Sequence, residues 1–325
     1  MNKEGVCTAA DGEVSRMEVR KTGFLYKLWN ILMPLVIYYA VYMISFFLLS
    51  CFYQVMAAKS GVAVVAFLQE QKTTLTGIVN GASMLIGAMV LVPLLRVELR
   101  MHRDRMPLYG RQNTFGQRVR MILLTTVLAG SSSIGLNILL ALTGFVQSSS
   151  GYQEVAQTQY GVAFGAGVVL YAVVSPLAEE IVFRGIIYNR MRRYLMEWQD
   201  RGTGQRVDNE LPRIRQVRLM KCPGNGGFDT TVTVAVIVSG VLFGAYHGNL
   251  IQGVYGGCMG ILMAYLYERT HAFYIPCLFH AVANCVVYMV AQNAILHERI
   301  FTYPCCITLL AVSLVMILIV EKVLR

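Results

Sequence analysis

The chain has 325 residues, of which 56% are hydrophobic and only 14% are charged, and its mean hydropathy is +0.54. Soluble domains carry about 25% charged residues, so this composition excludes an ordinary soluble protein and predicts a membrane protein with several spans. The net charge of +10 indicates basic cytoplasmic loops and contact with the lipid bilayer rather than binding to nucleic acid.

Eight apolar segments of membrane-spanning length follow one another along the chain. They lie near residues 24–55, 73–95, 121–146, 161–188, 231–247, 253–267, 273–290 and 300–320. The predicted fold class is therefore an all-α polytopic membrane protein, a bundle of about eight transmembrane helices. Two overlapping Gly-x-x-x-Gly spacings, Gly253 with Gly257 and Gly256 with Gly260, predict close packing of the sixth span against a neighbouring helix.

The distribution of basic residues predicts that both termini are cytoplasmic. On that topology, 24 of the 28 Lys and Arg residues fall in cytoplasmic segments, three fall in outer connections, and Arg184 lies inside a span. Cytoplasmic loops of membrane proteins carry such an excess of Lys and Arg. The cytoplasmic segments in this prediction are 1–30, 96–120, 185–230, 268–272 and 321–325.

The chain divides into four predicted regions. They are a cytoplasmic tail at 1–23, the first three spans with a basic loop at 24–158, a helical core at 159–295, and the last span with the C-terminus at 296–325. The helical core includes a cytoplasmic insert at 198–228, which is rich in Gly and Pro and has no regular hydrophobic period.

One hexapeptide, residues 179–184, holds all the Asp, Glu, Lys and Arg side chains that lie well inside a predicted span. An ionisable side chain near the bilayer centre costs at least ~2.5–3.5 kcal/mol, so three together indicate a function. Glu180 and Arg184 are four residues apart and can neutralise each other on one helix face. Glu179 points about 100° away and has no such partner, which favours a role in catalysis.

Three more polar side chains fall in later spans. His247 closes the sequence that begins at Phe243, and His280 lies one helical turn from Asn284. A hydrogen-bonded core histidine or an interhelical asparagine would explain each of them singly. Because such groups in a membrane face the bundle interior or a wet cavity, we expect them to meet Glu179 in one cavity. Counting 1.5 Å per residue from the expected cytoplasmic ends gives depths of ~16 Å for Glu179, ~24 Å for His247 and ~10 Å for His280, which favours a site between the inner surface and the midplane.

Hydrolysis is the chemistry that fits these groups. Glu179, helped by His247, would take a proton from water, and His280 with Asn284 would donate hydrogen bonds to the oxyanion. Alternatively, Glu179, His247 and His280 could be zinc ligands with an open fourth position, although the motif His-Glu-x-x-His is absent. The residues leave both mechanisms open, so the cofactor is either none or zinc.

The ordered motifs Glu-Glu-x-x-x-Arg, Phe-x-x-x-His and His-x-x-x-Asn, each in its own span, resemble those of the CPBP family. That family contains CAAX prenyl proteases and bacteriocin-processing enzymes, and it is related to bacterial self-immunity proteins. The resemblance covers roughly residues 160–295. It implies an eight-helix intramembrane endopeptidase, glutamate-dependent or metalloprotease, with its site in a cavity near the cytoplasmic side.

The resemblance also implies a role for each motif residue. Glu179 and His247 would activate water, His280 and Asn284 would stabilise the oxyanion, and Glu180, Arg184 and Phe243 would hold the architecture of the site. The substrate would be a peptide or protein at the membrane.

Two other classes of function compete with an enzyme. One is a non-catalytic immunity or scaffold membrane protein that binds a peptide or partner. The other is a proton-coupled transporter that uses Glu179 and the histidines as a relay, but such proteins often show repeated halves and no internal repeat is visible here. A binding protein needs no general base, so the four polar groups together favour the enzyme.

Overall fold

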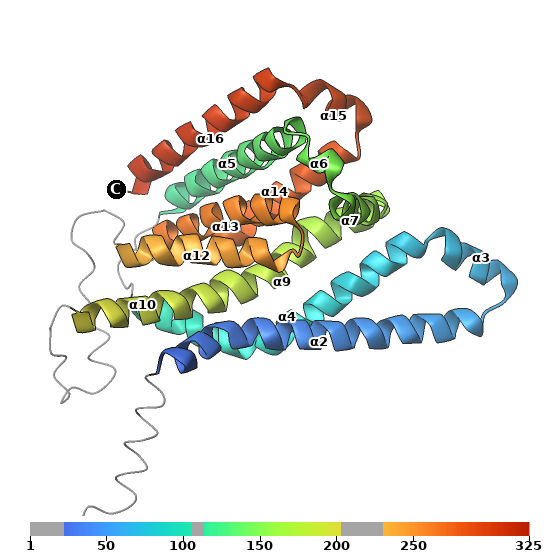
Figure 1. Ribbon diagram of the computed structural model, residues 1–325, viewed down its shortest axis with the longest axis horizontal. Helices are drawn as coiled ribbons and strands as arrows, with labels where there is room; N and C mark the ends of the chain where they lie inside the picture. Colours follow the sequence, from blue (N-terminus) through green and yellow to red (C-terminus); the bar gives the residue numbers. More distant parts are fainter. Residues whose placement is uncertain (1–22, 106–113, 203–229, 325) are drawn as a thin grey trace, which may run out of the picture.

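The computed structural model describes residues 23–105, 114–202 and 230–324, and in these ranges the chain is a bundle of helices (Figure 1). Among the described residues, seven helices are long and apolar enough to cross a membrane, which confirms the predicted class of multi-pass integral membrane protein. They are Phe24–Ala58 (α2), Lys72–His102 (within α4, Lys72–Arg105), Phe115–Leu142 (α5), Phe164–Gln199, Leu250–Thr270 (α13), Tyr274–Ala291 (α14) and Tyr303–Leu324 (α16).

The eighth predicted span, 231–247, forms the shorter apolar helix α12, Thr230–Tyr246. Its 17 residues correspond to about 25 Å at 1.5 Å per residue, at the lower limit of membrane-spanning length. All eight predicted spans are thus helical, and seven of them reach full spanning length. Much of the predicted insert at 198–228, together with the N-terminal tail and part of the basic loop, lies outside the described residues.

The fourth span was expected as one regular α-helix, but two π-helical stretches interrupt it. Its parts are α8 (Phe164–Val169), η1 (Leu170–Val174), α9 (Ser175–Glu180), η2 (Ile181–Tyr188) and α10 (Asn189–Gly202). Pro176 gives a physical reason for the first interruption, because it has no N–H to donate to the preceding turn. In the second, the Asn189 side chain donates to the carbonyl of Gly185 at 2.9 Å. Such π stretches are frequent at functional sites, and here they flank the segment that carries Glu179.

The helices are arranged around this interrupted span (Figure 1). The pair α2 and α4 lies on one side of it, α12, α13 and α14 lie on the other, and α5 with α16 lies beyond them. Four short helices that were not predicted gather at one end of the bundle: α3 (Val62–Glu70), α6 (Phe145–Ser148), α7 (Ser150–Tyr160) and α15 (Ala294–Ile300). We call this the short-helix end, and we call the opposite end, where α10 and α16 finish, the basic end.

Ion pairs between helices hold the basic end together. Sequence reasoning had treated the arginines of α10 as loop charges, but Arg190 and Arg192 are buried. Arg190 Nε lies 2.7 Å from Glu98 Oε1 on α4, and Arg192 Nη2 lies 2.6 Å from Glu268 Oε1 on α13. Further pairs are Arg193 with Glu98, Arg269 with Glu321, and Lys27 with Glu197. These contacts join α2, α4, α10, α13 and α16.

Close packing of α12 against α13 confirms the expectation from the Gly-x-x-x-Gly spacings. A Cβ at Gly244 would clash with the carbonyl oxygen of Gly253 and would lie 2.9 Å from the amide nitrogen of Gly257. Both neighbours are backbone, so neither can rotate away.

We therefore expect Gly244→Ala to force α12 and α13 apart and to destabilise the protein by roughly 1–3 kcal/mol, the usual range for overpacking. Thermal unfolding in detergent, followed by the loss of the monodisperse peak, would measure the effect. Gly165→Ala is the matched control, because a Cβ there meets no atom within 4 Å. An unchanged midpoint for Gly244→Ala would contradict the packing.

The orientation of the bundle in the membrane, with both termini in the cytoplasm, remains a prediction, because the structure contains no membrane. Gln157 lies on α7 at the short-helix end and Lys322 lies near the end of α16, and both are exposed. In a cysteine-free background, we expect an impermeant maleimide to label Gln157→Cys from outside the cell and Lys322→Cys only from the cytoplasmic side. Labelling of both positions from one side would show that the predicted topology is wrong.

Candidate active site

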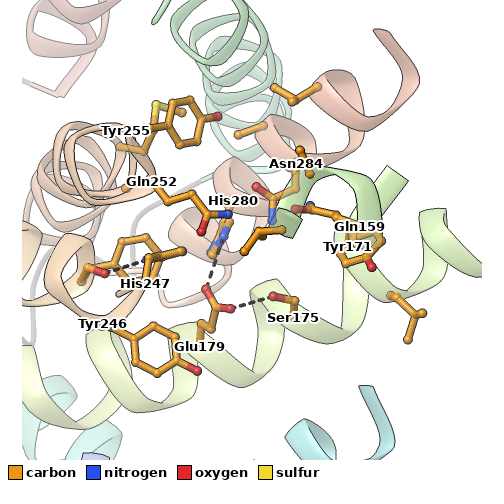
Figure 2. Close-up of a pocket in the computed structure, with 18 of the residues that line it drawn as sticks. Gln159, Tyr171, Ser175, Glu179, Tyr246, His247, Gln252, Tyr255, His280 and Asn284 are labelled. Atoms are coloured by element: carbon orange, nitrogen blue, oxygen red, sulfur yellow. Dashed lines mark hydrogen bonds and ion pairs between the residues drawn. The ribbon is translucent and has the colours of Figure 1, made fainter. Parts of the chain in front are cut away.

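A cavity of about 500 Å³ lies beside the hexapeptide 179–184. All four residues predicted to meet in one cavity line it, and Figure 2 shows their side chains around a common space. They are Glu179 from α9, His247 from the turn after α12, and His280 with Asn284 from α14. Phe243 lines the same cavity.

The Glu179 carboxylate has two close polar neighbours, of which sequence reasoning missed Ser175. The Ser175 hydroxyl donates to Glu179 Oε1 at 2.7 Å, and His280 Nε2 lies 3.7 Å from Oε2. Glu179 was expected to lack a partner on its own helix, yet Ser175 lies four residues earlier on the same face. That spacing was a usable signal in the sequence. Glu179 is 6% exposed, so it is buried but still faces the cavity.

The predicted pair of Glu180 and Arg184 is present and fully buried. Arg184 Nη1 lies 2.7 Å from Glu180 Oε1, and Arg184 Nη2 donates to the carbonyl of Gly260 at 3.0 Å. The contact that was not predicted is between His280 Nδ1 and the same Glu180 Oε1, at 3.0 Å. Glu180 therefore contacts both the Arg184 guanidinium and the His280 imidazole. Its contact with Nδ1 fixes the His280 ring so that Nε2 faces Glu179.

Phe243 is the packing centre of the site, in line with the structural role that the resemblance implies for it. The Arg184 guanidinium lies 4.5 Å from its ring centroid, a favourable cation–π contact. The rings of His247 and His280 meet it edge-on, at centroid distances of 5.0 Å and 5.5 Å. One apolar ring thus sets the position of both imidazoles.

His247 is oriented by the backbone of its own helix rather than by Glu179. Its Nδ1 lies 2.9 Å from the carbonyl oxygen of Phe243. Because that carbonyl can only accept, Nδ1 carries the proton, and Nε2 of the neutral ring is left as an acceptor. Gly256 leaves room for the ring, since a Cβ there would lie 3.3 Å from His247 Cε1. Gln252 and Tyr246 also line the cavity beside His247 (Figure 2).

The cavity lies in the opposite half of the bundle from the one expected. The depth estimate counted from Arg190, but α10 continues without a break to Gly202. Glu179 is therefore farther from the basic end than the count assumed. The cavity runs from Glu179 toward α7 at the short-helix end, since Tyr152, Gln159 and Tyr160 line it.

The possible zinc set was tested against this geometry. In the described ranges, no group of three or more His, Cys, Asp or Glu side chains is arranged to hold a metal ion. Glu179, His247 and His280 share the cavity, and the bonds of both Nδ1 atoms leave both Nε2 atoms free. The three side chains nevertheless do not converge as a ligand set for zinc in the described part of the chain.

The fold and the site define a polytopic helical membrane protein with a carboxylate and two imidazoles around a cavity inside the bundle. Residues 161–286 match the family described as "Type II CAAX prenyl endopeptidase Rce1-like". This match agrees with the resemblance to the CPBP family that the three motifs predicted.

The chain is 24% identical over 174 residues to a Bacillus subtilis (strain 168) protein named "Putative membrane peptidase YdiL". The match covers 48% of this chain and 57% of that protein, so the chain spans little more than half the length of the curated relative. No solved structure matches the chain.

Proposed function

We propose that this protein is an intramembrane endopeptidase that hydrolyses a peptide bond in a membrane-associated peptide or protein. The observation that carries the proposal is the arrangement of Glu179, a buried carboxylate that faces a cavity with Ser175 on one oxygen and His280 near the other. Family membership and the membrane-peptidase name of the relative support the same reaction.

In the proposed reaction, Glu179 is the general base for water. Ser175 occupies Oε1, so Oε2 is the oxygen that takes the proton as the water oxygen forms a bond to the substrate carbonyl carbon. His247 Nε2, an acceptor in the tautomer described above, orients the same water. The proton on Glu179 then passes to the leaving nitrogen when the C–N bond breaks, which returns the carboxylate to its starting state.

His280 and Asn284 would stabilise the oxyanion of the tetrahedral intermediate. The Asn284 amide is a donor without any change of charge. His280 donates from Nε2 only when both ring nitrogens carry protons, and the Glu180 carboxylate, 3.0 Å from Nδ1, is placed to pair with that imidazolium. Donors fixed in position before the charge develops are the usual source of this stabilisation.

The competing function of a proton relay is disfavoured by the point at which the chain of polar contacts from Glu179 ends. From Glu179 the contacts run through His280 and Glu180 to Arg184, which ends on the carbonyl of Gly260. Arg184 and Glu180 are fully buried, and an arginine does not deprotonate in proteins. A relay across the membrane has no next group at this point.

Metal dependence can be tested directly. We expect a chelator to leave cleavage unchanged, because the three candidate ligands do not converge as a set in the described part of the chain. Elemental analysis of active protein would then show no stoichiometric metal. Loss of activity with a chelator, followed by recovery with zinc, would contradict this expectation and restore the zinc mechanism.

The proposed substrates are a CAAX-type protein or a leader or bacteriocin-type peptide. Incubation of the purified full chain with such membrane peptides, with products read by mass spectrometry, tests the reaction. Cleavage by the wild type and none by Glu179→Ala supports the endopeptidase. A wild-type protein that binds these peptides tightly but never cleaves them would favour an immunity or scaffold protein instead.

A further inference from the structure

We infer that the substrate reaches Glu179 from the short-helix end of the bundle, so that the enzyme acts on a polypeptide segment outside the cytoplasm. The inference rests on the proposed function for the identity of the ligand, but the direction of access does not depend on the reaction. Four observations carry it: where the lining residues lie along their helices, how the opposite end is closed, which side chains meet the entering chain, and on which side the Lys and Arg residues lie.

Most of the residues that the spanning helices contribute to the cavity lie in the halves nearer the short-helix end. On α4, which begins there at Lys72, the lining residues run only from Gly77 to Met84. On α14, which finishes there at Ala291, they run from Phe279, just before the middle of the helix, to Val287. The cavity therefore extends from Glu179 mainly toward the short-helix end.

The route from the basic end is blocked by packed side chains. Directly below Glu180, the residues of η2 from Val182 to Tyr188 are buried, and Phe183, Arg184 and Tyr188 have no exposed surface. A Cβ at Gly185 would clash with the side chain of Leu95 on α4. Beyond this layer lie the ion pairs of the basic end. No path to Glu179 runs through this part of the described structure.

The mouth of the cavity is formed by α7, which is held in place by its connections. Tyr152, Val155 and Gln159 from this helix line the cavity (Figure 2 labels Gln159). At the end of α7, Gln292 Nε2 donates to the carbonyl of Tyr160 at 2.7 Å, and Tyr288 Oη donates to the carbonyl of Val162 at 2.9 Å. An arriving chain thus passes α7 before it meets Glu179.

The lining also indicates the chemistry of the segment that enters. Among the described residues that line the cavity there is no Lys or Arg, and Glu179 is the single carboxylate. Apart from Ser175 and the two histidines of the site, the other polar groups are amides and tyrosine hydroxyls, such as Asn80, Gln159, Gln252 and Tyr171. A substrate carboxylate would meet no Lys or Arg here, and the His280 imidazolium of the proposed reaction is already paired with Glu180. Burying an unpaired charge is costly. The cavity therefore suits an uncharged stretch of polypeptide that is cleaved away from a free C-terminal carboxylate, which favours the leader- or bacteriocin-type peptide over the CAAX-type protein among the proposed substrates.

The distribution of Lys and Arg indicates on which side of the membrane the short-helix end lies. Among the described residues, the short-helix end carries only Lys59, Lys72 and Arg299, whereas 24 of the 28 basic residues of the sequence fall in segments assigned to the other side. By the positive-inside rule, the short-helix end is extracytoplasmic. The substrate class is then a neutral segment of an exported or outward-facing membrane polypeptide.

The experiment uses single cysteines in a cysteine-free background of the full chain. Val287→Cys places a thiol on the cavity wall between His280 and the short-helix end, and Gln159→Cys places one on α7. Gln157→Cys is the matched control on α7 because it is exposed but does not line the cavity, and Lys322→Cys reports the basic end. Intact cells and inside-out vesicles are treated with a permanently charged, membrane-impermeant methanethiosulfonate, and modification is read by mass spectrometry.

We expect the reagent to modify Val287→Cys, Gln159→Cys and Gln157→Cys in intact cells only, and Lys322→Cys in inside-out vesicles only. Modification of Val287→Cys from the same side as Lys322→Cys would overturn the proposal, and so would labelling of Gln157→Cys from the cytoplasm. This readout needs no activity, so an inactive protein still decides the direction of access.

A second measurement links access to cleavage. Attaching a bulky impermeant maleimide to Gln159→Cys is expected to abolish cleavage of a neutral peptide, whereas the same group on Gln157→Cys should leave cleavage unchanged. Full cleavage by the blocked Gln159→Cys protein would contradict entry past α7. If no variant and no wild type cleaves any peptide, the proposed function fails, while the modification pattern still tests the direction.

Discussion

Replacing Glu179 by Gln is expected to leave a folded protein whose cleavage rate is at least ~10²-fold lower, the lower end for loss of a general base. Glutamine keeps the size of the side chain, and its carbonyl oxygen can still accept the hydrogen bond that Ser175 now donates to Oε1 at 2.7 Å. What is lost is the second oxygen as a proton acceptor. The defect should therefore appear in the rate constant rather than in the amount of folded protein.

The matched control is Glu154→Gln, which removes an exposed carboxylate from α7 at the same end of the bundle without touching the cavity. We expect its cleavage rate to equal that of the wild type. Rates are compared at equal amounts of monodisperse protein with a peptide that the wild type cleaves. A Glu179→Gln protein that cleaves at a near wild-type rate would show that another group is the base.

The contact between His280 and Glu180 changes what is expected of the second glutamate. Sequence reasoning gave Glu180 an architectural role only, because Arg184 lies one turn away. In the structure the same oxygen that holds Arg184 also holds His280 Nδ1. Glu180 is therefore a positioning residue for the imidazole, and its replacement should lower both stability and cleavage.

The parts of the fold that could be predicted are those set by local physical limits. The lengths of the apolar runs follow from bilayer thickness, and the Glu180–Arg184 pair follows from the spacing of a helical turn. That Glu179, His247, His280 and Asn284 share a cavity could be predicted because buried polar groups need partners. The first two predictions depend only on the sequence of a short stretch of chain. The third depends only on the general cost of burying a polar side chain without a partner.

The parts that could not be predicted depend on how distant helices pack. The bond from His280 to Glu180 joins positions 100 residues apart, and no spacing in the sequence encodes it. The ion pairs of Arg190 with Glu98 and of Arg192 with Glu268 span 92 and 76 residues. The depth of the site along the bundle was misjudged because it was counted from expected helix ends, and α10 is longer than its apolar run. Helix ends are the least certain feature of such a count.

The second large effect is expected at the buried pair of Glu180 and Arg184. Both side chains are fully buried, and the guanidinium is 2.7 Å from the carboxylate. Removing one partner of a buried pair typically costs ~3–5 kcal/mol, because the other charge is left uncompensated. Arg184→Gln leaves Glu180 facing Glu179 across His280, so its folded yield and thermal midpoint should fall steeply. Glu180→Gln leaves the Arg184 charge with the Gly260 carbonyl and the Phe243 ring as its remaining close contacts.

The double variant Glu180→Gln with Arg184→Gln should be more stable than the sum of the two single changes predicts, because it leaves no unpaired charge in the bundle. Lys27→Ala is the matched control: its pair with Glu197 is half-buried, and such a pair is worth only about 0–1 kcal/mol. Thermal unfolding of all four variants in one detergent measures the coupling. Strictly additive losses would show that the two charges do not stabilise each other. A double variant that regains stability but not cleavage would separate the pairing role of Glu180 from its role in holding His280, since the neutral amide introduced by Glu180→Gln no longer offers that imidazole a charged acceptor.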